Sequence, residues 1–149
     1  MFKLIVQKIK VYHLFWIVAL LILISTDPEE TIDINIHDTY FVISNLYVGV
    51  ILFLIYFLMG LGYWLIQRVF KKQLIKTLTI IHSSIFLGSF IVFWITIFSA
   101  RLFANSFPQY EYYSIINIVL TIIFLGMLFI ASPIYITNLL LTLVRKNNI

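Results

Sequence analysis

The segment TIDINIHDTYFVISNLYVGV, residues 31–50, joins the most polar part of the chain to a long apolar run. Its first half contains Asp33, His37 and Asp38, and after Asp38 no charged residue occurs before Arg68. A polar segment followed by an apolar run without charges, long enough to span a bilayer, predicts that a membrane-spanning helix begins here.

The composition as a whole is that of a membrane protein. Of 149 residues, 62% are hydrophobic and 11% are charged, and the mean hydropathy is +1.07. These values predict an all-α integral membrane protein in contact with lipid. The absence of cysteine excludes disulfides, thiolate zinc sites and cysteine nucleophiles. The net charge of +4 comes from cations beside apolar runs, which indicates membrane orientation rather than a nucleic-acid partner.

Four apolar runs predict four transmembrane helices in a single domain, approximately residues 8–26, 40–66, 78–103 and 113–144. The first run, residues 11–24, is short, so it is expected to extend back through a short N-terminal amphipathic segment, residues 1–10. The alternative for this end is a cleaved secretory signal. Pro133 is expected to kink the fourth helix.

The charges of the loops predict the orientation of the helices. The N-terminal segment, the second loop and the C-terminal end hold nine of the ten cations and no acid. The first and third loops hold all six acids and Arg101. Because cytoplasmic segments are enriched in Lys and Arg, both termini are expected in the cytoplasm and residues 31–40 on the outer face. The expected location is the inner membrane of a bacterium.

The motif D-I-N-I-H-D-T-Y, residues 33–40, resembles the loop before a helix in the catalytic subunit, subunit I, of the haem-copper terminal oxidases. The segment TIIHSSIFLG, residues 79–88, and Arg101 with FANSFPQYEYY, residues 103–113, are similar to later parts of that subunit. The chain as a whole therefore resembles the last four helices of the subunit.

The resemblance implies that the ancestral chemistry has been lost. In the family, an alanine and an H-F-H pair follow the motif, and the two histidines bind haem iron. Here Ser44, Asn45, Leu46 and Tyr47 stand in these positions. The family's copper ligands belong to earlier helices that have no counterpart in these residues. The resemblance therefore implies that this polypeptide alone is not an enzyme that reduces oxygen.

Three residues of the motif could bind a divalent metal ion. Asp33, His37 and Asp38 match family positions near the haem propionates and a non-redox magnesium or manganese ion. Carboxylates with one imidazole are suitable ligands for Mg²⁺ or Mn²⁺. The alternative is local structure, in which Asp38 or Thr39 caps the second helix while Asp33 and His37 hold the loop by hydrogen bonds.

A haem could also bind between His13 and His82. His13 lies just inside the first predicted span and His82 just inside the third, so the two imidazoles are expected at similar depth. The alternative is that both histidines form hydrogen bonds near the membrane surface, without any cofactor.

The remaining polar groups of the spans are suited to helix packing. They include no carboxylate at mid-helix, which weakens the prediction of a proton pump or ion-coupled transporter. Asn45 or Asn117 could hydrogen-bond across helices, and Ser84 with Gly88 makes a small-residue face. We therefore expect an accessory or scaffold subunit that binds other integral membrane proteins. The alternative is an electron-transfer protein that uses the haem or the metal described above.

Overall fold

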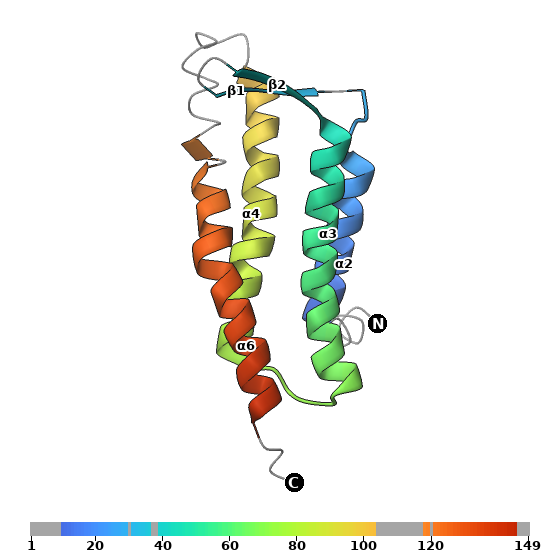
Figure 1. The fold of residues 1–149 in the computed structure, drawn as a ribbon, viewed down its shortest axis with the longest axis vertical. Helices are drawn as coiled ribbons and strands as arrows, with labels where there is room; N and C mark the ends of the chain where they lie inside the picture. Colours follow the sequence, from blue (N-terminus) through green and yellow to red (C-terminus); the bar gives the residue numbers. More distant parts are fainter. Residues whose placement is uncertain (1–9, 30, 37–38, 104–117, 120, 146–149) are drawn as a thin grey trace. The chain divides into compact units, whose positions relative to one another are not determined.

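The computed structural model describes residues 10–29, 31–36, 39–103, 118–119 and 121–145. The chain divides into two compact units, Met1–Val69 and Phe70–Ile149, and each is described by itself. The first runs from blue to green in Figure 1, and the second from yellow-green to red. The expectation of one four-helix domain stays a prediction.

The first unit pairs two antiparallel helices. Helix α2, Val11–Ser25, leads through a short connection and a β-hairpin into α3, Asn45–Trp64, which continues as the π-helical turn η1, Leu65–Val69. The α2 helix ends where Thr26 and Ser25 donate side-chain hydrogen bonds to the carbonyl oxygen of Ile22, at 2.8 and 3.0 Å. Asp27 then accepts from the backbone N–H of Glu29 at 3.0 Å, which turns the chain toward the hairpin.

Residues 40–44, expected to be helical, are instead extended. Strand β1, Thr31–Ile36, pairs antiparallel with β2, Thr39–Ser44. The prediction that the second span begins at Tyr40 is therefore wrong, because β-branched and aromatic residues fill β2 and favour a strand. The predicted helix cap at Thr39 is wrong for the same reason. The N-cap of α3 is Ser44, and Asp38 lies outside the described residues.

The face between α2 and α3 is packed with aromatic rings and glycine. Tyr12, Phe15, Tyr56 and Tyr63 are buried, and the ring of Phe15 meets that of Tyr63 edge-on with centroids 5.8 Å apart. A Cβ added at Gly60 would lie 2.6 Å from the Trp16 ring and 3.1 Å from the Cβ of Phe15. The two helices can approach this closely at Gly60 because glycine has no side chain.

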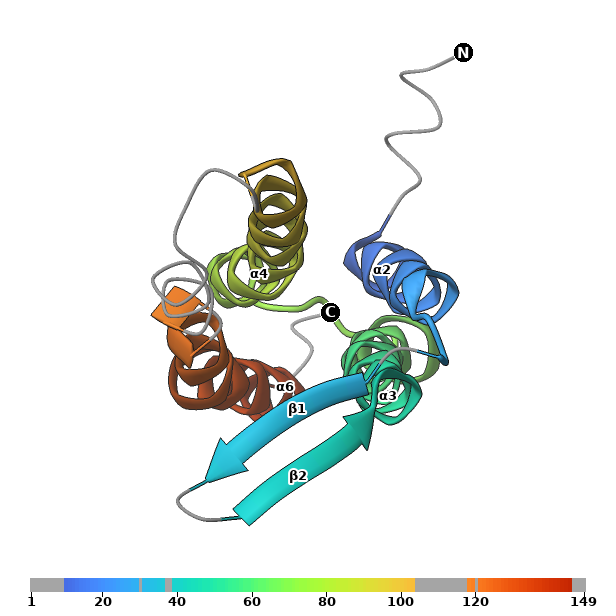
Figure 2. The ribbon, with the colours of Figure 1, turned by 90° about the horizontal axis from the view of Figure 1, so that it is seen from above.

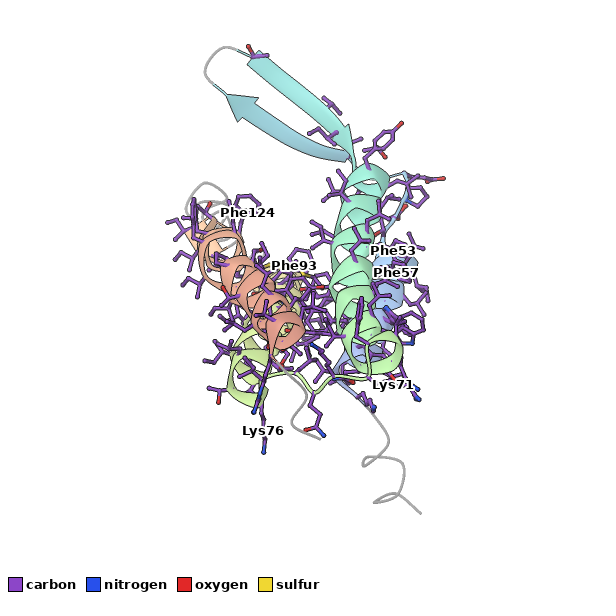
Figure 3. The ribbon with its side chains drawn as sticks, turned by 60° about the horizontal axis from the view of Figure 1, so that its bottom comes forward. Phe53, Phe57, Lys71, Lys76, Phe93 and Phe124 are labelled. Carbon is purple, nitrogen blue, oxygen red and sulfur yellow. The ribbon has the colours of Figure 1, made fainter. Side chains whose placement is uncertain are left out.

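Two further contacts extend this packing along α3. The Trp16 indole N–H donates to the carbonyl oxygen of Phe57 at 3.4 Å, and the rings of Phe53 and Phe57 stack along α3 (Figure 3). In the first turn of α2, the hydroxyl of Tyr12 accepts a hydrogen bond from Arg68 Nε at 3.2 Å. Beyond η1, Lys71 has a φ of 52°, in the left-handed region that terminates many helices.

The second unit also pairs antiparallel helices. Helix α4, Lys76–Phe103, lies beside a helical segment at residues 121–125 that continues as the π-helical turn η2, Gly126–Ala131, and α6, Ser132–Val144 (Figure 1). The helix changes from π to α geometry one residue before Pro133. Ser132 donates to the carbonyl oxygen of Met127 at 2.8 Å, five residues earlier. A π-helical turn thus directly precedes the helix that contains Pro133, a residue that lacks the N–H needed to continue an α-helix. The kink expected at Pro133 stays a prediction.

Among the residues that the structure describes, three helices are long and apolar enough to cross a membrane. They are Asn45–Val69, Lys76–Thr96 and Thr121–Val144, and they confirm that the second, third and fourth predicted spans contain long apolar helices. Val11–Ser25 is apolar but shorter. Its expected extension through residues 1–9, and the predicted start of the fourth span at residue 113, lie outside the described residues.

Candidate functional site

Of the three residues predicted to bind a metal, the structure describes Asp33, which lies in the β-hairpin. The backbone of Asp33 belongs to β1, where it pairs with Val42 of β2. His37 and Asp38 lie outside the described residues. Within the described part of the chain, no three or more His, Asp or Glu side chains gather in a group that could hold a metal ion. The metal site at Asp33, His37 and Asp38 stays a prediction.

His13 takes part in the start of α2. Its Nδ1 accepts a hydrogen bond from the backbone N–H of Lys10 at 3.1 Å, and its own backbone N–H donates to the carbonyl oxygen of Lys10 at 2.9 Å. The imidazole also contacts the rings of Tyr12 and Trp16, with centroids 4.2 and 6.3 Å away. An accepting Nδ1 places the proton of the neutral ring on Nε2. His13 thus helps to begin α2.

His82 is fully buried between aromatic rings of the second unit. Its ring centroid lies 4.8 Å from that of Phe86 on the same helix and 4.9 Å from that of Tyr135 on α6. His13 and His82 belong to different units. The haem predicted between them stays a prediction.

Four buried polar side chains lie along the contact between α4 and α6. We call them the polar seam: Thr79, His82, Asn138 and Thr142. Polar groups are expensive to bury away from water, so each requires hydrogen bonds or another compensating contact. The seam is therefore the strongest candidate functional site among the described residues.

Asn138 connects the start of α4 to the middle of α6. Its Oδ1 accepts from the backbone N–H of Ile75 at 3.1 Å, and its Nδ2 donates to Thr79 Oγ1 at 2.8 Å. Thr79 Oγ1 in turn donates to the carbonyl oxygen of Ile75 at 3.0 Å. The N–H of Ile75 precedes α4 and has no carbonyl of an earlier helical turn to bond. A side chain from another helix thus provides the cap that the α4 sequence lacks.

The seam continues toward the end of α6. Thr142 lies one turn beyond Asn138, is 1% exposed, and its Oγ1 has no hydrogen-bond partner among the described residues. Lys72 Nζ then donates to the carbonyl oxygens of Leu143 and Arg145, which end α6. A cation at the C-terminus of a helix also interacts favourably with the helix dipole. These contacts hold α6 against the segment that begins α4.

The polar seam was not predicted from the sequence, although a signal for it was present. Thr79, His82 and Phe86 have the spacing of one helix face, and so do Tyr135, Asn138 and Thr142. Interhelical hydrogen bonds were expected at Asn45 or Asn117, and Asn117 lies outside the described residues. The small-residue face at Ser84 and Gly88 makes no close contact, because a Cβ at Gly88 would meet no atom within 4 Å. The close glycine contacts are at Gly49 and Gly60.

Comparisons with known proteins give no match. No protein-family model matches the chain, and neither a curated protein nor a solved structure is significantly similar to it.

Proposed function

We propose that the chain is an integral membrane protein of the inner membrane that serves as a non-catalytic accessory or scaffold subunit of a respiratory-type assembly. In this proposal both termini lie in the cytoplasm. The protein keeps the helix order of the last four helices of haem-copper oxidase subunit I without the haem ligands. Its activity is to bind other integral membrane proteins.

The observation that carries this proposal is the apolar surface of the helices. In the most apolar 18-residue stretch of each of the three long helices, only 28%, 17% and 11% of the residues are buried within the protein. Large aliphatic and aromatic side chains such as Ile95, Phe98 and Phe129 are more than half exposed. Lipid or the helices of other proteins must cover this surface.

The start of α3 supports a non-catalytic role. Asn45 and Tyr47 occupy the positions that correspond to the two haem-iron histidines of the oxidases, and both lie in the first turn of α3. Tyr47 is 68% exposed. An amide in place of one imidazole and an exposed phenol in place of the other do not supply the axial ligands of two haems.

The test is to extract the tagged protein gently from its native membrane and identify what remains bound. We expect integral membrane proteins to co-purify in stoichiometric amount and to dissociate in a harsher detergent. A tagged membrane protein of similar size serves as the control. Recovery of the 17.5 kDa chain alone under the gentlest conditions would contradict the proposal.

One substitution can locate a partner-binding face without disturbing the fold. Gly88 lies on α4 where an added side chain meets no atom within 4 Å, so Gly88→Leu should fold normally. If partners bind through the small-residue face of α4, Gly88→Leu will lose them at unchanged stability. Gly126→Leu serves as the matched control, because a Cβ added at Gly126 would also meet no atom within 4 Å.

An absorbance spectrum tests the non-catalytic part of the proposal separately. A purified protein with a Soret band that disappears in His13→Ala or His82→Ala would contradict it, and would favour a haem-binding electron-transfer protein. Stoichiometric Mg²⁺ or Mn²⁺ that disappears in Asp33→Asn or His37→Ala would instead establish the outer metal site.

A further inference from the structure

The β-hairpin has one apolar face and one more polar face. Residues that pair directly across two strands lie on the same face, and so do residues two apart on one strand. The register places six positions on the first face: Ile32, Ile34, Ile36, Thr39, Phe41 and Ile43. The same register places six on the second: Thr31, Asp33, Asn35, Tyr40, Val42 and Ser44. Five of the first six are large apolar residues, so the hairpin is amphipathic.

The hairpin joins α3 directly. Strand β2 ends at Ser44 and α3 begins at Asn45, so no linker separates the hairpin from a helix long enough to cross a membrane. Figures 1 and 2 show the two strands lying crosswise to α3 at its N-terminal end. If α3 crosses a bilayer, a hairpin whose strands lie crosswise to α3 runs along the membrane surface.

Within the described part of the first unit, the main contact of the hairpin with another element is that of β2 with α3. A two-stranded hairpin is marginally stable by itself in water, and it needs its apolar face covered. The face formed by the isoleucines and Phe41 therefore requires a covering surface beside the end of α3.

We propose that the hairpin lies in the boundary between headgroups and acyl chains of the outer leaflet, with its apolar face toward the acyl chains. This inference rests on the proposed membrane embedding and not on the accessory role. The continuity with α3 holds the hairpin at this depth, where amphipathic elements bury their apolar faces. Tyr47, exposed in the first turn of α3, lies beside the hairpin at the level where tyrosines anchor membrane proteins.

The charges of this region favour apolar over electrostatic binding. Asp33 lies on the more polar face, and Asp27 and Glu29 precede the hairpin, whereas no Lys or Arg occurs between Lys10 and Arg68. Anionic lipid headgroups do not attract an acidic segment, so they add no electrostatic binding energy. The hairpin should therefore stay bound to zwitterionic phosphatidylcholine vesicles when the salt concentration is raised.

The test uses single spin labels, which the chain permits because it has no native cysteine. Ile34→Cys and Ile43→Cys report the apolar face, and their neighbours Asn35→Cys and Val42→Cys report the other face. The full-length labelled proteins are placed in phosphatidylcholine vesicles, and the accessibility of each label to oxygen and to a water-soluble nickel chelate is measured. We expect the oxygen-to-nickel ratio to be about threefold higher at Ile34 and Ile43 than at their neighbours.

Two other outcomes would overturn the inference. Equally high nickel accessibility at all four positions would place the hairpin in water. Low accessibility to both reagents at Ile34 and Ile43 would mean that protein covers the apolar face. A label at Leu54→Cys, at the middle of α3, separates this failure from failure of the membrane embedding. It must be accessible to oxygen and not to nickel if α3 crosses the bilayer.

A measurement on the unmodified protein guards against a labelled variant that fails to fold. Hydroxyl-radical oxidation in the same vesicles, compared residue by residue with the denatured chain, should protect Phe41 and leave the adjacent Tyr40 reactive. Equal protection factors for the two residues would contradict the proposed orientation.

Discussion

The two units hold similar pairs of antiparallel helices together by different means. In the first, a glycine at position 60 lets α3 approach the Trp16 ring and the Cβ of Phe15, and aromatic rings fill the rest of the contact. In the second, Asn138 joins α6 to Ile75 and Thr79 by hydrogen bonds. Both pairs bury few residues in total, so a small number of contacts determines how well each pair is held.

The difference predicts different sensitivities. Close packing depends on many van der Waals contacts that all require the same short separation, so added volume disturbs all of them together. A hydrogen-bonded contact is local, and a single interhelical hydrogen bond in a membrane contributes on average well under about 1 kcal/mol. The first unit should therefore be sensitive to side-chain size, and the second to the loss of particular polar groups.

The largest effect is expected from Gly60→Leu. The new side chain would overlap Trp16 and Phe15 and force α2 from α3, which should destabilise the first unit by about 3 kcal/mol. Unfolding in mixed micelles with increasing SDS, followed by circular dichroism, measures the change.

Gly88→Leu is the matched control for this substitution. A Cβ at Gly88 meets nothing, so the replacement should be neutral or slightly stabilising through its better helix propensity. If both variants lose similar amounts of unfolding free energy, the effect of Gly60→Leu does not come from the contact between α2 and α3.

Asn138→Leu tests the seam of the second unit. The substitution leaves the partly buried N–H of Ile75 without its acceptor and the buried Thr79 hydroxyl without its donor, and it should cost about 2 kcal/mol. The same unfolding measurement applies, with Thr137→Val as the control because Thr137 is exposed on the adjacent position of α6.

A double-mutant cycle with Thr79→Val refines this result. It should give a coupling energy of about 0.6 kcal/mol between Asn138 and Thr79. Additive effects would show that the two side chains act independently.

Tyr12→Phe removes a polar contact from the first unit without changing its volume. The hydroxyl accepts from Arg68 Nε at 3.2 Å, and we expect a loss of about 0.5–1 kcal/mol in the same assay. Tyr47→Phe, which changes an exposed hydroxyl, should have no effect. If Tyr12→Phe lost much more unfolding free energy than Asn138→Leu, the first unit rather than the second would depend mainly on polar contacts, which contradicts the proposed difference between the units.

The smallest effect is expected from Lys72→Met. It removes the ammonium group that caps α6 at Leu143 and Arg145, which corresponds to about 0.5 kcal/mol. Amide hydrogen exchange should become about twofold faster in the last turn of α6. Lys71→Met removes the same charge from the neighbouring residue and should leave that exchange unchanged.

The spans were predictable because their signal is a sum over many residues. Twenty or more apolar residues without a charge indicate a long apolar helix regardless of what packs beside it, as for Asn45–Val69. The strand β2 was not predicted, because Tyr40 to Ser44 are apolar or β-branched and suit either a helix end or a strand. Pairing with β1 decides between the two, and it is a contact between separate segments.

The sequence by itself determined the apolar character, the presence of the three long apolar helices and the grouping of positive charge, because each depends only on residue type and order. The tertiary structure alone decided that Gly60 rather than Gly88 is a close contact, and that Asn138 caps α4 across the α4–α6 contact. A glycine or an asparagine has the same local properties wherever it lies on a helix. Its role depends on the atoms that another segment places within a few ångströms, and the order of residues does not specify these.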